Sequence, residues 1–103
     1  MSGIADTTNI IPLNYGIALT QASVLALSAN PTRGAVTFHN PNAGKNIWIA
    51  PLGTTATPNG AGCYQIFPGG DRVFMDKQRA TCGWNACTDA AQTANLSILE
   101  WPN

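Results

Sequence analysis

The chain has few charged residues, a single histidine and no long apolar run. Only 10% of its 103 residues are Asp, Glu, Lys or Arg, against about 25% in an average globular domain. Five basic and five acidic residues cancel, and no basic run is present that could neutralise a row of phosphates. No stretch reaches the roughly 18 apolar residues that a membrane-spanning helix needs. We therefore expect no nucleic-acid partner and no membrane span.

An export signal and an even number of cysteines are also missing. The start of the chain has no basic segment followed by an apolar core, so it does not look like a secretory signal peptide. The three cysteines are Cys63, Cys82 and Cys87, an odd number that favours reduced thiols in a protein made in a cytosol. One alternative is a disulfide bond between Cys82 and Cys87 across a tight loop. The alternative is that each cysteine is a small buried apolar side chain.

Candidate catalytic and metal-binding residues are sparse. A nucleophilic site would have to be built around His39, and nothing in the surrounding sequence supports one. One histidine and three scattered cysteines lack the paired short spacing of zinc sites. Asp71 and Asp76 flank a short strand, where turn capping and solubility explain them better than acid–base chemistry or calcium binding. We therefore predict a protein that is not an enzyme and that holds no metal and no cofactor.

What the chain does contain is short apolar runs separated by Gly, Pro and Asn. Residues 33–50 read RGAVTFHNPNAGKNIWIA, and their two strand-like runs flank a turn-forming segment, which predicts a β-hairpin. Val36 and Phe38 alternate with polar residues, as in a half-buried strand. The second run has isoleucines on one face and Trp48 on the other. That strand is either central in a sandwich or covered on one face by a neighbouring subunit.

The same pattern continues along the rest of the chain and predicts further short strands. They are expected at residues 15–20, 22–28, 63–67, 72–75, 80–87 and 96–101. Residues 22–28 could form a helix by their Ala and Leu content, but an Asn-Pro pair soon ends the run. Residues 51–62 are expected to be a loop with a tight Asn-Gly turn. The pattern predicts an all-β fold, a single small β-sandwich of about seven or eight short strands with jelly-roll-like or Ig-like topology.

The beginning of the chain differs from this pattern. Residues 1–14 show neither a strand period nor a helix period, so we interpret them as an extended N-terminal arm. Its apolar side chains are Ile4, Ile10, Ile11 and Leu13. Residues 15–103 then form the β-sandwich domain, because a chain of this length has room for one core only. An arm with a few apolar side chains suggests docking on a partner.

Three tryptophans offer large apolar faces. Trp48, Trp84 and Trp101 could form a sugar-stacking platform, but in a small β domain they more often anchor the core and subunit interfaces. We take Trp48 and Trp101 as candidate interface residues, together with the apolar residues of the arm. The low charge removes repulsion between copies and so favours assembly with other subunits.

The order of several motifs along residues 33–102 is the basis of a resemblance. The motifs are RGAVTFHN, NIWIAP, a Thr/Gly/Pro loop, an apolar strand ending in PGG, a Trp-Asn-Ala strand and a terminal LSILEW. In this order they resemble small β-sandwich accessory proteins in the virions of tailed bacteriophages. No single motif is specific; their order carries the resemblance, and the first third of the chain is outside it.

The resemblance implies a structural virion protein without catalytic residues. It would be a capsid decoration (cement) protein that binds the outside of the phage head and stabilises contacts between major capsid protein subunits. Alternatives are another component of the neck, tail or fibre attachment, or a host-glycan-binding module, which needs an exposed aromatic pair beside Asn or Asp. The implied partners are the major capsid protein or other virion proteins. A homotrimer is favoured, located on the virion surface after synthesis in the host cytoplasm.

Overall fold

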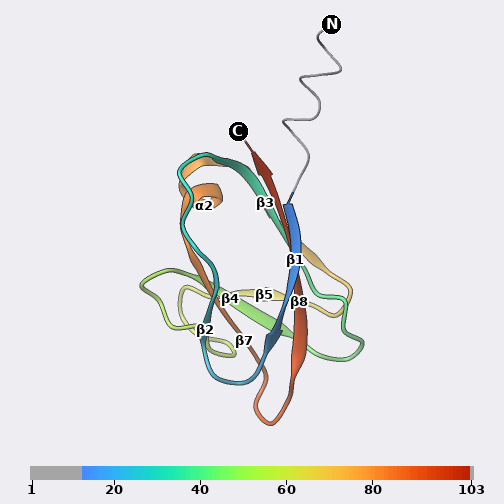
Figure 1. The fold of residues 1–103 in the computed structure, drawn as a ribbon. Coiled ribbons are helices and arrows are strands. Elements are labelled where there is room, and N and C mark those ends of the chain that lie inside the picture. The colour runs from blue at the N-terminus through green and yellow to red at the C-terminus, as the bar shows by residue number, and fades with distance from the viewer. Residues whose placement is uncertain (1–12, 103) are drawn as a thin grey trace, which may run out of the picture.

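Eight strands and one short helix follow one another in the part of the chain that the structure describes (Figure 1). The structure is a computed structural model that describes residues 13–102. The strands are β1 (Leu13–Leu19), β2 (Val24–Leu27), β3 (Arg33–His39), β4 (Ile47–Pro51), β5 (Tyr64–Ile66), β6 (Asp71–Phe74), β7 (Trp84–Thr88) and β8 (Ala94–Pro102). The helix, α2 (Lys77–Thr81), lies between β6 and β7. The start of β1, the end of β8 and α2 lie at the same end of the molecule.

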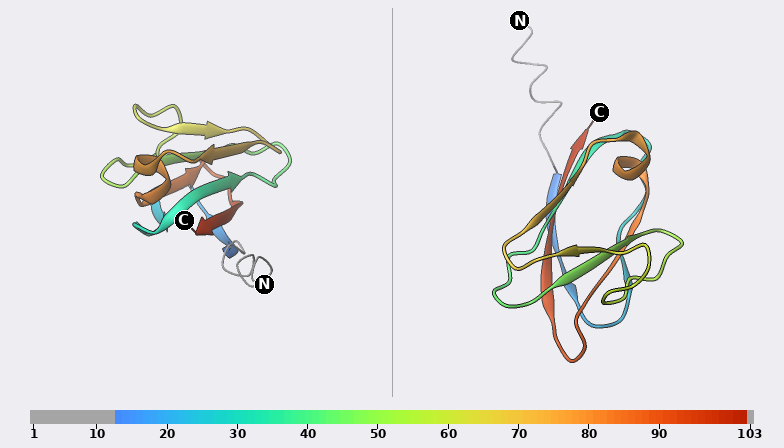
Figure 2. Two further views of the ribbon diagram at one scale, coloured as in Figure 1. Left: turned by 90° about the horizontal axis from the view of Figure 1, so that it is seen from above. Right: turned by 180° about the vertical axis from the view of Figure 1, so that it is seen from behind.

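The strands form two antiparallel sheets that face each other. One sheet has the order β1-β8-β3-β6 and the other has the order β2-β7-β4-β5. Figure 2 shows the two layers from above. Strands that follow one another along the chain mostly lie in opposite sheets, which is the arrangement of an eight-stranded jelly roll. The predicted all-β sandwich is confirmed, and of the two expected topologies the strand order selects the jelly roll.

The β-hairpin predicted for residues 33–50 is wrong. The first strand, β3, pairs with β6 and β8, whereas β4 pairs with β5 and β7 in the other sheet. The connection between them is held by Asn40, which is fully buried and donates from Nδ2 to the carbonyl oxygens of Lys45 and Ile66 at 2.6 and 2.9 Å. Ile66 belongs to β5, so Asn40 ties this turn across the two layers. A turn composition predicts a change of direction but not which strands pair.

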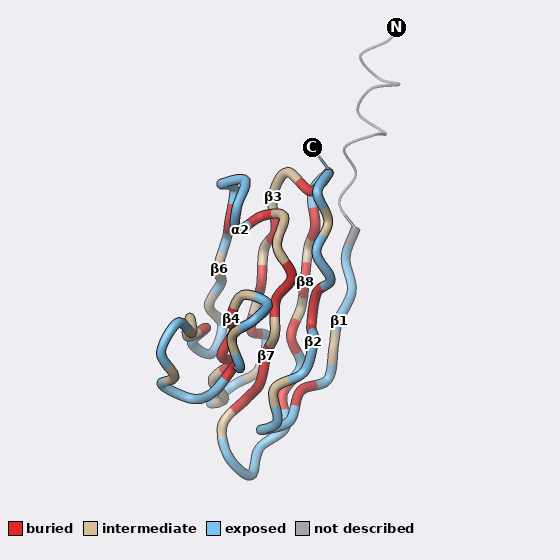
Figure 3. Tube along the Cα trace, turned by 90° about the vertical axis from the view of Figure 1, so that its left-hand side faces the viewer, coloured by how far each residue is buried: buried red, intermediate tan, exposed pale blue. Residues whose placement is uncertain are grey.

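The core between the sheets is centred on Trp84. Its ring stacks on Phe74 with centroids 4.8 Å apart, and meets Phe38 and Tyr64 edge-on at 5.6 and 5.8 Å. The indole Nε1 donates to the carbonyl oxygen of Arg79 at 3.0 Å, so the one polar atom of this side chain is satisfied. The aliphatic part of the core consists of Leu19, Leu27, Val36, Ile47, Ile49, Ile66, Leu96 and Ile98. Figure 3 shows the buried segments where the two sheets face each other.

The strand predicted at residues 80–87 begins later than expected. Ala80 and Thr81 end helix α2, and β7 starts only at Trp84. Asp76 is the N-cap of α2: its carboxylate accepts a hydrogen bond from the backbone N–H of Arg79 at 3.1 Å. That bond holds the pKa of Asp76 below its usual value. An Asp before a Lys-Gln-Arg-Ala run is a helix-start signal that the strand interpretation overlooked.

The predicted arm is only partly within the described residues. Strand β1 begins at Leu13, so the last two residues of the arm belong to a strand that pairs with β8 along its whole length. Ile4, Ile10 and Ile11 lie outside the described residues, and the side chain of Leu13 is not described either. The structure therefore describes none of the four apolar side chains of the arm.

Candidate contact surface

The outer face of the β1-β8-β3-β6 sheet carries a row of uncharged and mostly apolar side chains. Alternate residues of each strand point away from the core, and the strand registers set them side by side. Trp101 lies opposite Ala35, and in the next row Leu99 lies opposite Thr37, which lies opposite Val73. Met75 directly follows β6 and continues the alternation of Val73. We call the six residues Ala35, Thr37, Val73, Met75, Leu99 and Trp101 the apolar outer face.

Three of the six residues of the apolar outer face are exposed, the other three are half-buried, and none of the six is charged. Val73 and Met75 are 55% and 74% exposed, and Trp101 is 38% exposed. Ionisable side chains lie at its margins: Lys77 lines a hollow together with Met75, and Asp71 pairs through Oδ1 with Nδ1 of His39. Contiguous exposed apolar area on a small protein commonly marks a contact with another molecule. This face is therefore the candidate functional surface.

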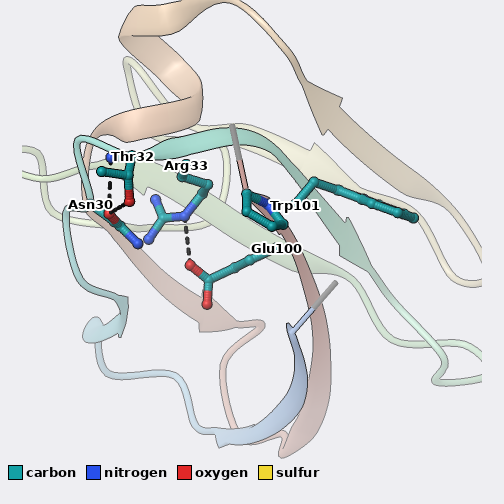
Figure 4. Close-up of a pocket in the computed structure, with 6 residues that line it drawn as sticks. Asn30, Thr32, Arg33, Glu100 and Trp101 are labelled. Atoms are coloured by element: carbon teal, nitrogen blue, oxygen red, sulfur yellow. Dashed lines mark hydrogen bonds and ion pairs between the residues drawn. The ribbon is translucent and has the colours of Figure 1, made fainter. Parts of the chain in front are cut away.

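A shallow pocket of about 170 Å³ adjoins the face where β8 ends (Figure 4). It is lined by Asn30, Thr32, Arg33, Glu100, Trp101 and Pro102. Arg33 and Glu100 are both buried, and Arg33 Nε donates to Glu100 Oε1 at 2.6 Å. Asn30 Oδ1 accepts hydrogen bonds from the backbone N–H and the hydroxyl of Thr32, which shapes the opposite wall. The pocket thus places a buried ion pair directly beside the exposed Trp101.

The Arg33 guanidinium is held by protein acceptors on every nitrogen. Besides the bond to Glu100, Nη1 donates to the carbonyl oxygens of Ala80 and Cys82 at 3.0 and 3.3 Å. Nη2 donates to the carbonyl oxygen of Ser28 at 2.7 Å. These partners come from β8, the end of α2 and the β2–β3 connection. Arg33 therefore connects separate segments of the chain by hydrogen bonds. We call Arg33 and Glu100, with the carbonyl oxygens that Arg33 binds, the clamp, and its role at the base of the pocket is structural.

Tyr15 lies on the other side of Glu100, in a wider hollow of about 380 Å³. Burial, and then the neighbouring Glu100 carboxylate, raise the pKa of Tyr15 from 10.0 to about 12. The charged form of the phenol is disfavoured in the folded chain, because burial removes its hydration and the carboxylate repels it. Tyr15 is therefore uncharged at neutral pH and stays so well into the alkaline range.

This pKa predicts a loss of stability at alkaline pH. Between pH 10.0 and about 12 the unfolded chain releases the Tyr15 proton while the folded chain keeps it. The folded state then binds more protons, so the free energy of unfolding falls as the pH rises through this interval. Urea denaturation at a series of alkaline pH values measures the slope. The Tyr15→Phe variant should show a smaller decrease; equal decreases in both proteins would contradict the assignment.

Trp48 is buried by its own chain. It is only 6% exposed, and its Nε1 donates to Asp89 Oδ1 at 2.8 Å. On the outer side of β4 it belongs to a second apolar cluster with Ala50, Ala56 and Cys87, against which Cys63 packs. Ala56 and Cys63 come from the β4–β5 connection, which covers this side of the sheet. Strand β4 is central in its sheet, and the chain itself covers both of its apolar faces. Trp48 therefore has no free surface for the subunit interface that the sequence predicts.

The three tryptophans do not come together as a sugar-stacking platform. Trp84 lies in the core between the sheets, Trp48 lies under the β4–β5 connection, and Trp101 is exposed at the end of β8. Of the candidate interface residues that the structure describes, Trp101 alone has substantial free surface. The sequence identified Trp101 but not its neighbours on the apolar outer face.

The cysteines are free thiols in this structure. Cys63 and Cys82 are half-buried and Cys87 is buried, so the bridge left open between Cys82 and Cys87 is not formed. Burial raises the pKa of Cys87 to about 11, and it also raises the pKa of Cys82. Both groups are therefore protonated thiols near neutral pH, which fits small packed side chains better than nucleophiles.

Within residues 13–102, no three His, Cys, Asp or Glu side chains gather as metal ligands would. No helix among these residues is long and apolar enough to cross a membrane.

Comparison with known proteins supports the fold. No protein-family model and no curated protein sequence matches the chain. Several solved structures are similar in fold, and two of them have TM-scores above 0.5. The stem and receptor-binding domain of the spike protein P1 from bacteriophage PM2 has a TM-score of 0.56 and 14% identity, and the match covers 79% of this chain but 30% of that one. A de novo designed double-stranded β-helix has a TM-score of 0.55 and 12% identity, covering 85% and 97%. At these identities the likeness is one of fold.

Proposed function

We propose that the protein is a structural component of a bacteriophage virion, and specifically a capsid decoration protein that binds the outside of the head. The observation that carries the proposal is the uncharged apolar outer face on a jelly-roll sheet. The motif order, which resembles virion accessory proteins, supports the same class. The fold likeness to part of a phage spike protein is compatible with it. In this role the protein is not an enzyme and needs no cofactor.

The mechanism is burial of neutral surface between a decoration protein and the subunits of the major capsid protein. Val73, Met75 and Trp101 have free apolar area, and its removal from water favours association without any charge pairing. Because the face is uncharged, attachment should depend little on salt. Many copies on one shell repeat the same contact, so a modest affinity per copy can stabilise joints between capsid subunits. The apolar residues Ile4, Ile10, Ile11 and Leu13 of the arm predicted at residues 1–14 remain a candidate second contact.

Location in an intact particle tests the proposal directly. Electron cryomicroscopy of particles of the virus that encodes the chain should show the sandwich at regular positions outside the head. Density in the neck, tail or fibre would replace the decoration role by another accessory role. Absence of the chain from purified particles would overturn a virion function altogether.

Two lysines on the apolar outer face should strongly weaken attachment. The Val73→Lys/Met75→Lys variant places unpaired charges in the proposed contact, and occupancy on heads should fall more than about tenfold, since burying one such charge costs more than about 1.4 kcal/mol. Measurement is by binding of purified protein to heads that lack it. The matched control is Leu25→Lys/Leu52→Lys, which adds the same charge at similarly exposed positions of the other sheet and its loop. If both variants bind like the wild type, the face is not the contact.

A second candidate is a part of a host-attachment spike or fibre. It is favoured by the likeness in fold to the stem and receptor-binding domain of a phage spike. The position in the particle separates it from decoration, because a spike component would occupy a few sites instead of covering the shell. In either role we propose that the chain acts as a symmetric homo-oligomer.

A further inference from the structure

The four outer strands of the two sheets differ in how well their free edges are protected. Exposed edges invite pairing with another chain, and proteins usually protect them by short strands, charges or irregular pairing. Strand β5 has three residues, and β6 has four and carries Asp71 and Arg72. Strand β2 has four residues, and its pairing shifts register between Leu25 and Leu27. Each of these edges has at least one protective feature.

Strand β1 has none of these features. It is seven residues long, its sequence LNYGIAL contains no charge and no proline, and it pairs with β8 in an unbroken register. No described strand pairs with its other edge. Although the strand is rich in apolar residues, Tyr15 is 39% exposed. Figure 3 shows most of β1 as exposed, in contrast to β8 beside it.

We infer that β1 pairs edge to edge with β1 of a second copy of this chain. The two strands run antiparallel about a two-fold axis, and the two four-stranded sheets become one continuous sheet. Two identical edges without charge do not repel each other. The backbone N–H and C=O groups that point away from β8 then gain partners along the seam.

The side chains of β1 fit the same partner. Tyr15 and Ile17 lie on the core side of the strand, and Gly16 and Ala18 lie on the outer side. In a register centred on Gly16, Tyr15 faces Ile17 of the partner subunit, and the reverse contact is made by symmetry. Aromatic and β-branched residues are favourable cross-strand pairs. The small outer residues leave the surface flat where the two sheets join.

This pairing has consequences for assembly. It sets two apolar outer faces side by side, which doubles the contact area that one unit offers to a larger partner. A two-fold contact closes at two copies, so it predicts a dimer instead of the trimer that the family resemblance implies. The inference concerns the free protein in solution and does not rest on the virion role, so each can fail without the other.

Sedimentation of the purified full chain tests the pairing. The wild type should show twice the chain mass of 10.8 kDa at high concentration. The Gly16→Lys/Ala18→Lys variant brings four like charges to the seam and should sediment at the mass of one chain. Position 16 tolerates a side chain, because an added Cβ would meet only the carbonyl oxygen of Leu96, at 3.7 Å. The control Leu52→Lys/Phe67→Lys adds the same charge at exposed positions next to β4 and β5, at the end of the other sheet opposite to β2, and should stay dimeric. A wild type that is monomeric or trimeric, or a dimeric seam variant, overturns the inference.

Hydrogen exchange followed by NMR separates edge pairing from other contacts. Alternate backbone N–H groups of β1 point away from β8, and in the wild type they should become slow to exchange as the protein concentration rises. In the Gly16→Lys/Ala18→Lys variant they should stay fast. A dimer without this protection would mean that the sheets stack face to face. Protection of these N–H groups in a protein that sediments at the mass of one chain would mean that residues 1–12 of the same chain occupy the edge. Either result overturns the inference.

Discussion

Replacing Trp84 by alanine should cost the domain about 3–5 kcal/mol of unfolding free energy, the usual range for removing a buried aromatic ring. Trp84 is fully buried, stacks on Phe74 and touches Phe38 and Tyr64. Alanine leaves a cavity between the sheets and removes the donor to the carbonyl oxygen of Arg79. Urea denaturation followed by circular dichroism measures the loss, which is a large part of the roughly 5–15 kcal/mol expected for a domain.

The matched control is Trp101→Ala. The same residue type is removed, but Trp101 lies on the apolar outer face and retains much of its exposure to water. The free energy of unfolding should therefore fall clearly less than in Trp84→Ala. Equal losses in the two variants would contradict the division between a core tryptophan and a contact tryptophan.

The positions of the strands were predictable because their signal is local. The alternation of Val36 and Phe38 with polar residues predicted β3, and β4 and β8 lie close to the residues assigned to them. The local signal at the start of the strand predicted for residues 80–87 belongs to a helix, so the prediction is wrong there. Ala80 and Thr81 were assigned to a strand, yet the capping aspartate before them starts a helix. The helix is short and lies close before β7, so the strand predicted for residues 80–87 includes its last two residues.

The pairing of the strands was not predictable in the same way. Turn residues between β3 and β4 looked like a hairpin, but the chain crosses to the other sheet there. Asn40 holds the chain at this crossing, because its amide donates a hydrogen bond to the carbonyl oxygen of Ile66, 26 residues away. Such a bond depends on tertiary structure, and no pattern within a window of residues contains it.

The candidate surface also depends on contacts between residues that are far apart in the sequence. The apolar outer face exists because Trp101 lies opposite Ala35 and Val73 lies opposite Thr37. The sequence showed that both faces of β4 are apolar, but not that the β4–β5 connection returns to cover Trp48. Single residues were therefore recognisable as contact candidates, whereas the face they form was not.

Removing the buried positive charge by Arg33→Met should also cost about 3–5 kcal/mol of unfolding free energy. The Glu100 carboxylate would remain buried without its partner, and the carbonyl oxygens of Ser28, Ala80 and Cys82 would lose a donor. Arg33 and Glu100 are 67 residues apart in sequence, so the clamp joins the first half of the chain to its last strand. The change is measured by urea denaturation.

Two further variants separate the clamp from a general effect of losing an arginine. In Arg33→Met/Glu100→Leu no buried charge is left unpaired, so this double variant should recover part of the loss. Arg79→Met removes the exposed pair with Asp76 and should be far less destabilising, because solvent screens that pair. If Arg79→Met is as damaging as Arg33→Met, the buried network is not a clamp. If Arg79→Met is much less damaging, the rigidity of the contact surface at the end of β8 depends on the buried ion pair of Arg33 and Glu100, which lines the same pocket as Trp101.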